Sequence, residues 1–191
     1  GANLWKENVF ADTIKNFNDT EFDRFFARNI FAGKDDMKSC AELFDSLKNT
    51  GILSKNSRII LSQIIPSGGQ HLSRLLKNNS SKCIEEIAKA EKEFFANAEN
   101  NLFNWDETTI EETFSTKGFE CKCIPFVQTE KRRITEEDCS KWFDEENSAY
   151  GRFISEKAGR ENFNSFKELF LQEAQKSTFD WKVKNCIIII G

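Results

Sequence analysis

Four side chains stand where this sequence could bind a ligand. Arg28 and Asn29 end the strand pattern FDRFFA, His71 follows a Ser-Gly-Gly turn, and Trp105 lies beside polar residues. An imidazole can act as a general base or ligand contact, and an indole ring can stack on a base or cofactor ring. Each position also has a structural alternative. The strand end can bond its own loop, the histidine can cap a helix start, and the tryptophan can pack ahead of the next helix.

A strand-helix-strand unit must position the first two of these residues. A strand is expected at 21–27, an amphipathic helix over Met37–Asn49 that Gly51 ends, and a second strand over 57–66. Strands joined through a packed helix form a parallel pair with a right-handed crossover, which predicts an open α/β sheet. Ligands of such sheets lie beyond the carboxyl ends of the strands, here Arg28, Asn29 and the 67–71 loop. The glycine-rich turn that would hold a cofactor is missing.

The remaining pattern predicts one α/β domain over 1–191, with a helical excursion over 128–178 before the last strand. The run 58–65 is apolar at nearly every position, which is typical of a strand buried on both faces. A helix over 81–99 has an apolar stripe that a single acid, Glu91, interrupts. Further helices are expected within 4–18, around Leu72, Leu75 and Leu76, and from Asp106 to Gly118. A strand is expected from Phe119, with Pro125 at an edge or strand end. A capping box at Thr135 opens another helix, a last helix lies between Arg160 and Lys176, and a final strand runs to Ile190.

Composition excludes several classes of function. The net charge is -4 with 30% charged residues, so no global field draws the chain to nucleic acid or anionic lipid. The longest apolar run, Cys186–Ile190, is too short to span a bilayer. Six scattered cysteines and a single histidine do not predict a metal site, and they favour reduced thiols in the cytoplasm.

Lys131, Arg132 and Arg133 form the densest basic cluster of the sequence. These cations could contact the phosphates of DNA, which gives one candidate function, a nucleic-acid-binding module. Four acids at positions 130 and 136–138 surround them, so the alternative is a solvated face or intramolecular ion pairs.

The order of elements resembles the second half of a class I S-adenosylmethionine-dependent methyltransferase. EFDRFFARNIF resembles the fourth-strand motif of that family, LKNTGILSKNSRIILSQIIP the segment that follows it, and FSTKGFECKCI the Gly-Phe entry to the sixth strand. The resemblance implies a partial doubly wound, Rossmann-like sheet of parallel strands with an antiparallel C-terminal edge and helices on both faces.

A narrower resemblance covers nearly the whole chain. QHLSRLL, the stretch from KAEKEFF to STKGF, KRRITEEDCSKWF and the closing TFDWKVKN resemble the methyltransferase-like region behind the AAA+ module of some bacterial replication-associated recombination ATPases. This resemblance implies a partner in the rest of a parent chain, an AAA+ module, and DNA contact through that parent. We therefore expect the chain to be a fragment of a longer protein.

Departures from these families shape the functional expectation. No G-x-x-x-x-G-K-[ST] motif is present, so ATP hydrolysis cannot be assigned to these residues. The glycine-rich first motif of methyltransferases would precede Leu4, so this fragment is expected to bind no cofactor and to carry no catalytic residues. The leading hypothesis is a non-catalytic interaction or scaffolding region. Its rival is a methyltransferase whose S-adenosylmethionine loop lies upstream, with Arg28, Asn29, His71 and Trp105 lining the substrate side.

Overall fold

The computed structural model describes residues 21–76, 81–97 and 101–191, and its contacts cluster into two compact units. The first unit consists of Gly1–Pro66, Asn101–Phe126 and Lys184–Gly191, and the second of Ser67–Asn100 and Val127–Val183. Two long strands, β3 and β4, supply residues to both units. The expectation of a single domain stays a prediction.

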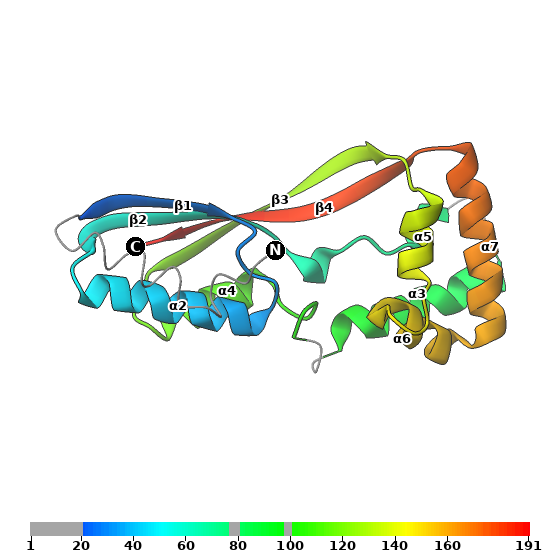
Figure 1. The fold of residues 1–191 in the computed structure, drawn as a ribbon, viewed down its shortest axis with the longest axis horizontal. Helices are drawn as coiled ribbons and strands as arrows, with labels where there is room; N and C mark the ends of the chain where they lie inside the picture. Colours follow the sequence, from blue (N-terminus) through cyan, green and yellow to red (C-terminus); the bar gives the residue numbers. More distant parts are fainter. Residues whose placement is uncertain (1–20, 77–80, 98–100) are drawn as a thin grey trace. The chain divides into compact units, whose positions relative to one another are not determined.

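A four-stranded sheet organises the first unit. Its order is β1-β2-β4-β3, and Figure 1 shows β3 and β4 running in opposite directions. β1 pairs in parallel with β2, with Arg28 opposite Ser62, and β4 is antiparallel to β2, with Ile190 opposite Ile59. The mixed α/β class and the parallel pair are therefore confirmed. The last strand, β4, was expected to form an antiparallel edge of the sheet. It is antiparallel but lies inside the sheet, and β3 forms the edge. The strands are β1 (Phe22–Arg28), β2 (Leu53–Ile64), β3 (Cys121–Arg132) and β4 (Phe179–Ile190).

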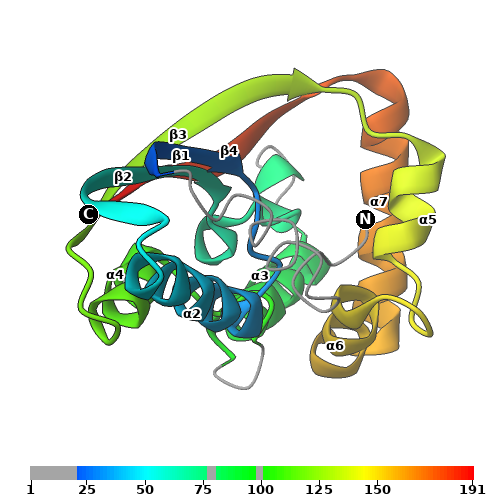
Figure 2. The same cartoon turned by 60° about the vertical axis from the view of Figure 1, so that its left-hand side comes forward.

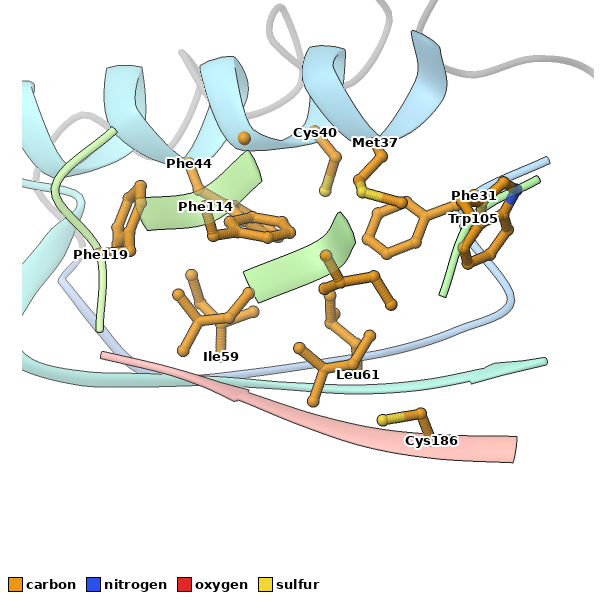
Figure 3. Close-up of a cluster of buried hydrophobic side chains, with 14 of the residues drawn as sticks. Phe31, Met37, Cys40, Phe44, Ile59, Leu61, Trp105, Phe114, Phe119 and Cys186 are labelled. Atoms are coloured by element: carbon orange, nitrogen blue, oxygen red, sulfur yellow. The ribbon is translucent and has the colours of Figure 1, made fainter. Parts of the chain in front are cut away.

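Two helices of the first unit, α2 (Lys34–Asn49) and α4 (Glu107–Ser115), lie on one face of this sheet (Figures 1 and 2). The predicted caps form. Gly51 has a φ of 78° just after α2, a backbone conformation that favours glycine. Asp106 and Thr109 make a reciprocal capping box at the start of α4. Aromatic and aliphatic side chains fill the space between helices and sheet (Figure 3), among them Phe44, Phe114, Leu61 and Ile59.

The prediction that β2 is buried on both faces is wrong. Ile59 and Leu61 are buried beneath α2 and α4, but Ile60 is half-buried and Ile64 is exposed. The reason is that both described helices of this unit cover the same face. Helices on the opposite face remain a prediction, because the expected helix within 4–18 lies outside the described residues.

The second unit is helical apart from its share of β3 and β4. Its core is a cluster of phenylalanines in which Phe143 packs against Phe163, Phe166 and Phe170 at 5.7 to 5.9 Å between ring centroids. The elements are the 3₁₀ turns η1 (Pro66–Gly68) and η2 (Ser73–Leu76) and the helices α3 (Lys82–Ala96), α5 (Glu136–Trp142), α6 (Ala149–Ala158) and α7 (Arg160–Lys176).

Three elements of the second unit differ from expectation. The helix expected around Leu72 is only the 3₁₀ turn η2. The strand β3 continues through Pro125 to Arg132, so the expected excursion over 128–178 begins as strand. The helix α6 was not predicted. Its buried Gly151 breaks the apolar pattern, yet a Cβ there would clash with the Asp144 carbonyl, so close packing selects glycine.

Candidate functional site

Asn29 holds the loop at the carboxyl end of β1. Its φ of 49° lies in the left-handed region, which asparagine tolerates better than most residues. Its backbone N–H donates to the Ser62 carbonyl at 2.8 Å, and its Oδ1 accepts from the Ile64 N–H at 3.1 Å. The Asn29 side chain is therefore engaged by the backbone of the next strand, whereas Arg28 is exposed.

At the carboxyl end of β2, the side chain of Gln63 also bonds to the backbone of the chain. This side chain is buried, with its Oε1 accepting from the Phe31 N–H at 3.2 Å and its Nε2 donating to the Phe31 carbonyl at 3.1 Å. The amide thus satisfies both backbone groups of one loop residue. Sequence reasoning missed this residue, although a glutamine within an otherwise apolar strand was a visible signal.

Trp105 belongs to the core of the first unit. Its side chain is 3% exposed and meets Phe31 edge-on with ring centroids 6.4 Å apart (Figure 3). The indole Nε1–H donates to the Leu102 carbonyl at 3.0 Å. The ring is thus buried and its polar atom is bonded within the protein, which favours the packing alternative over a stacking platform for a ligand.

His71 belongs to the second unit, whereas Arg28, Asn29 and Trp105 belong to the first. Its ring packs on Phe95 with centroids 4.8 Å apart. Burial, with a smaller contribution from the Arg74 guanidinium, lowers the pKa of His71 to about 4. The imidazole is therefore neutral at pH 7.

Glu91 of α3 is a buried side chain in the second unit that accepts hydrogen bonds from several donors. Its Oε1 accepts from the Leu72 N–H at 2.6 Å and from the Tyr150 hydroxyl at 2.7 Å. Its Oε2 accepts from the Ser73 N–H at 3.2 Å and from the Ser73 hydroxyl. The Glu91 side chain thus ties α3 to η2 and to α6, and its donors compensate in part for burial of the carboxylate.

Ser73, His71 and Glu91 are the residue types of a hydrolytic triad, but their geometry is different. The Ser73 hydroxyl is buried and donates directly to the carboxylate, and the His71 Nδ1 lies 3.7 Å from Glu91 Oε2, beyond hydrogen-bond length. A triad needs the imidazole between the hydroxyl and the acid. The cluster is therefore a structural anchor. Its sequence signal was the acid that interrupts the apolar stripe of the helix.

Burial also affects the pKa values of this cluster. Burial raises the pKa of Glu91, against the lowering effect of its hydrogen bonds from Ser73, Tyr150 and Leu72. Burial and the adjacent Glu91 raise the pKa of the Tyr150 hydroxyl, so this group remains a donor at neutral pH.

The lowered pKa of His71 predicts an acid-dependent loss of stability. Between pH 6.5 and about 4 the unfolded chain binds a proton at this residue and the folded chain does not, so unfolding becomes easier as pH falls. We expect a loss of about 2–3 kcal/mol over this range relative to His71→Gln. His71 is the only histidine of the chain, so its single imidazole NMR signal reports the pKa directly. A signal that titrates near pH 6.5 would contradict this prediction.

The basic cluster is largely engaged within the second unit. Lys131 Nζ lies 2.6 Å from Asp180 Oδ1, and the Arg132 guanidinium stacks over Trp181 at 4.7 Å from the ring centroid. Arg133 is exposed. These contacts favour intramolecular pairing for two of the three cations over phosphate binding.

Two negative findings apply to the described parts of the chain, 21–76, 81–97 and 101–191. None of their helices is both long and apolar enough to cross a membrane. No three or more histidine, cysteine, aspartate or glutamate side chains within them are arranged to hold a metal ion.

Comparison by sequence finds no matching family model and no matching curated protein. Comparison by structure finds two cyclopropane synthases and an N-methyltransferase among the similar structures. The mycolic acid cyclopropane synthase CmaA1, complexed with SAH and CTAB, is 18% identical with a TM-score of 0.33, and the match covers 91% of this chain and 56% of that chain. The cyclopropane synthase MmaA2 from Mycobacterium tuberculosis is 13% identical with a TM-score of 0.31, and the match covers 97% of this chain and 67% of that chain.

A third match is the Haemonchus contortus phospholethanolamine N-methyltransferase 2 in complex with phosphomonomethylethanolamine and S-adenosylhomocysteine. It is 12% identical with a TM-score of 0.28, and the match covers 88% of this chain and 33% of that chain. The chain thus spans 56% and 33% of the lengths of the first and third of these proteins. All three TM-scores lie below 0.5.

Proposed function

We propose that this chain is a methyltransferase-like, non-catalytic interaction or scaffolding region of a longer AAA+ protein that acts in DNA replication or recombination. The resemblance in the order of elements motivates the family and the parent. The observation that carries the non-catalytic role is the engagement of side chains at the carboxyl ends of the parallel strands. In sheets of this class ligands bind at that edge, but there the Asn29 side chain bonds the backbone of β2 at Ile64, and the Gln63 side chain bonds the backbone of Phe31.

Calorimetric titration of the 191-residue chain with S-adenosylmethionine tests this proposal. We expect no saturable binding up to about 1 mM ligand, which corresponds to a binding free energy weaker than about -4 kcal/mol. Binding in the micromolar range would overturn the non-catalytic proposal. The variant Arg28→Ala is the matched control for that outcome, because the Arg28 side chain is exposed at the same edge. Lost binding in this variant would place a cofactor there and favour a methyltransferase.

The proposed parent can be tested separately. An upstream P-loop of the type G-x-x-x-x-G-K-[ST] in the full-length protein would support an AAA+ ATPase. A glycine-rich strand-turn-helix upstream would instead support an S-adenosylmethionine-dependent methyltransferase. Either sequence outcome is independent of the titration of the 191-residue chain.

A further inference from the structure

One face of the sheet in the first unit carries an apolar surface. The described helices of this unit, α2 and α4, lie on the other face (Figure 1). On the outward side of β1 and β2, Phe26 is 68% exposed, Ile64 is 43% exposed and Ile60 is half-buried. Ile187 and Ile189 of β4 are half-buried on the same side. Apolar patches of this kind at a protein surface mark sites of interaction.

Strand register places three of these side chains in one row. Phe26 of β1 pairs with Ile60 of β2, and Ile60 pairs with Ile189 of β4. Their neighbours Phe25 and Ile59 pack into the core, so the row itself lies on the opposite face of the sheet. The row spans three strands, or about 10 Å between the outer two, which matches the width of an α-helix.

Exposed arginines border this apolar row on both sides. Arg24 pairs with Arg58 in the row before it, and Arg28 pairs with Ser62 in the row after it. Neighbouring rows on one face lie about 7 Å apart, because residues i and i+2 share a face. Arg24 and Arg58 donate to the backbone carbonyls of the residues before them, at 2.7 and 3.0 Å. No ion pair joins any of these three arginines to a carboxylate in the part of the chain that the structure describes.

The charge of this surface has one sign. The outward-facing residues within 24–28, 58–64 and 185–189, which we call the open sheet face, include the three arginines and no acid, whereas the whole chain has a net charge of -4. A complementary partner therefore carries acids beside an apolar stripe, which is the pattern of an acidic amphipathic helix. Isoleucines outnumber aromatic rings on the open sheet face. This composition suits aliphatic side chains better than nucleic-acid bases, which stack on aromatic rings.

From these observations we infer that the open sheet face docks an acidic amphipathic helix of a partner protein. The apolar stripe of that helix covers the row of Phe26, and its acids meet the three arginines on either side. This inference rests on the proposed interaction role and gives that role a class of partner. It does not depend on whether the chain binds S-adenosylmethionine, so the peptide experiment below and the calorimetric titration can fail separately.

Selection from a displayed peptide library, with the 191-residue chain as bait, tests this inference. Each peptide has about 18 residues, or five helical turns, with leucines fixed along one stripe and glutamate, glutamine or lysine allowed beside it. We expect glutamate to be enriched on both margins of the stripe.

Fluorescence anisotropy then measures the affinity of an enriched peptide for variants of the chain. Arg28→Glu should weaken binding about tenfold, because it places like charges together, and Phe26→Asp at least tenfold, because it puts a charge into the apolar contact. Lys38→Glu is the matched control, since it reverses an exposed cation on α2 and should leave the affinity unchanged.

A charge swap makes this test specific. The double variant Arg24→Glu with Arg28→Glu should enrich lysine in place of glutamate at the same margins. Circular dichroism of each variant shows that the chain is folded. Enrichment without a preference for glutamate, or binding by folded variants that none of these changes weakens, would overturn the inference.

Two other occupants of the open sheet face give different results. If no peptide is enriched and Phe26→Ala destabilises the chain as much as Phe44→Ala, the chain itself covers this face and the inference is wrong. Binding of single-stranded oligothymidylate that Phe26→Asp abolishes would assign the face to nucleic acid and would equally contradict a helical partner. Absence of any enrichment, with Phe26→Ala near neutral, would also overturn the inference.

Discussion

Replacing Glu91 with alanine is expected to destabilise the chain by about 2–4 kcal/mol, one of the two largest effects of any single change we predict. The carboxylate accepts hydrogen bonds from the N–H groups of Leu72 and Ser73 and from two hydroxyl groups. Removing it leaves buried donors without an acceptor, and each such donor costs about 1–3 kcal/mol. Loss of the buried charge offsets part of this cost. Urea unfolding followed by circular dichroism measures the change.

Two variants make this test specific. Glu91→Gln keeps one acceptor oxygen without the charge, so it should lose less stability than the alanine variant. Glu93→Ala on the same helix removes an exposed carboxylate whose ion pair with Lys157, at 3.1 Å, is largely in water, so we expect less than about 1 kcal/mol. Equal effects of Glu91→Ala and Glu93→Ala would show that the buried cluster does not anchor the second unit.

Phe44→Ala should destabilise the first unit by about 3–5 kcal/mol. The Phe44 side chain is fully buried between α2 and the sheet (Figure 3). Its ring centroid lies 5.1 Å from that of Phe25 and 6.3 Å from that of Phe114. Truncation removes the transfer free energy of the ring and leaves a cavity that the neighbouring rings cannot fill without moving. Urea unfolding of the variant measures this loss as a lower midpoint.

Phe26→Ala is the matched control, because Phe26 stands next to Phe25 on β1 but is 68% exposed. It removes the same ring from the opposite face of the sheet, so we expect a change within about 1 kcal/mol, the span of strand propensity. A cost similar to that of Phe44→Ala would show that the open face of the sheet is covered in solution.

The sequence predicted those elements whose limits are set by local chemistry. Alternation and apolar runs located the strands, and the capping residues at Asp106 and Thr135 marked helix starts because a side-chain oxygen satisfies a free N–H there. The helix α6 was missed, because its glycine is selected by a close approach to the Asp144 carbonyl, a neighbour that only the fold supplies.

The candidate site was less predictable than the elements. Position alone suggested that Arg28, Asn29, His71 and Trp105 face a ligand. Whether such a side chain faces a ligand or the protein depends on which backbone donors and rings lie within a few ångströms. Those neighbours are far away in the sequence: the Asn29 side chain bonds Ile64, and the His71 ring packs on Phe95.

By itself, then, the sequence determined a mixed α/β chain with a parallel strand pair, because periodicity and caps act over a few residues. Only the tertiary structure decided which strand is the edge, which face of β2 is open, and that an acid in an apolar stripe is the centre of a buried anchor. These features depend on pairing and packing between segments that are distant in the sequence. Those contacts, and not the local sequence pattern, determine the free energy of burying a charge or of leaving a strand edge open.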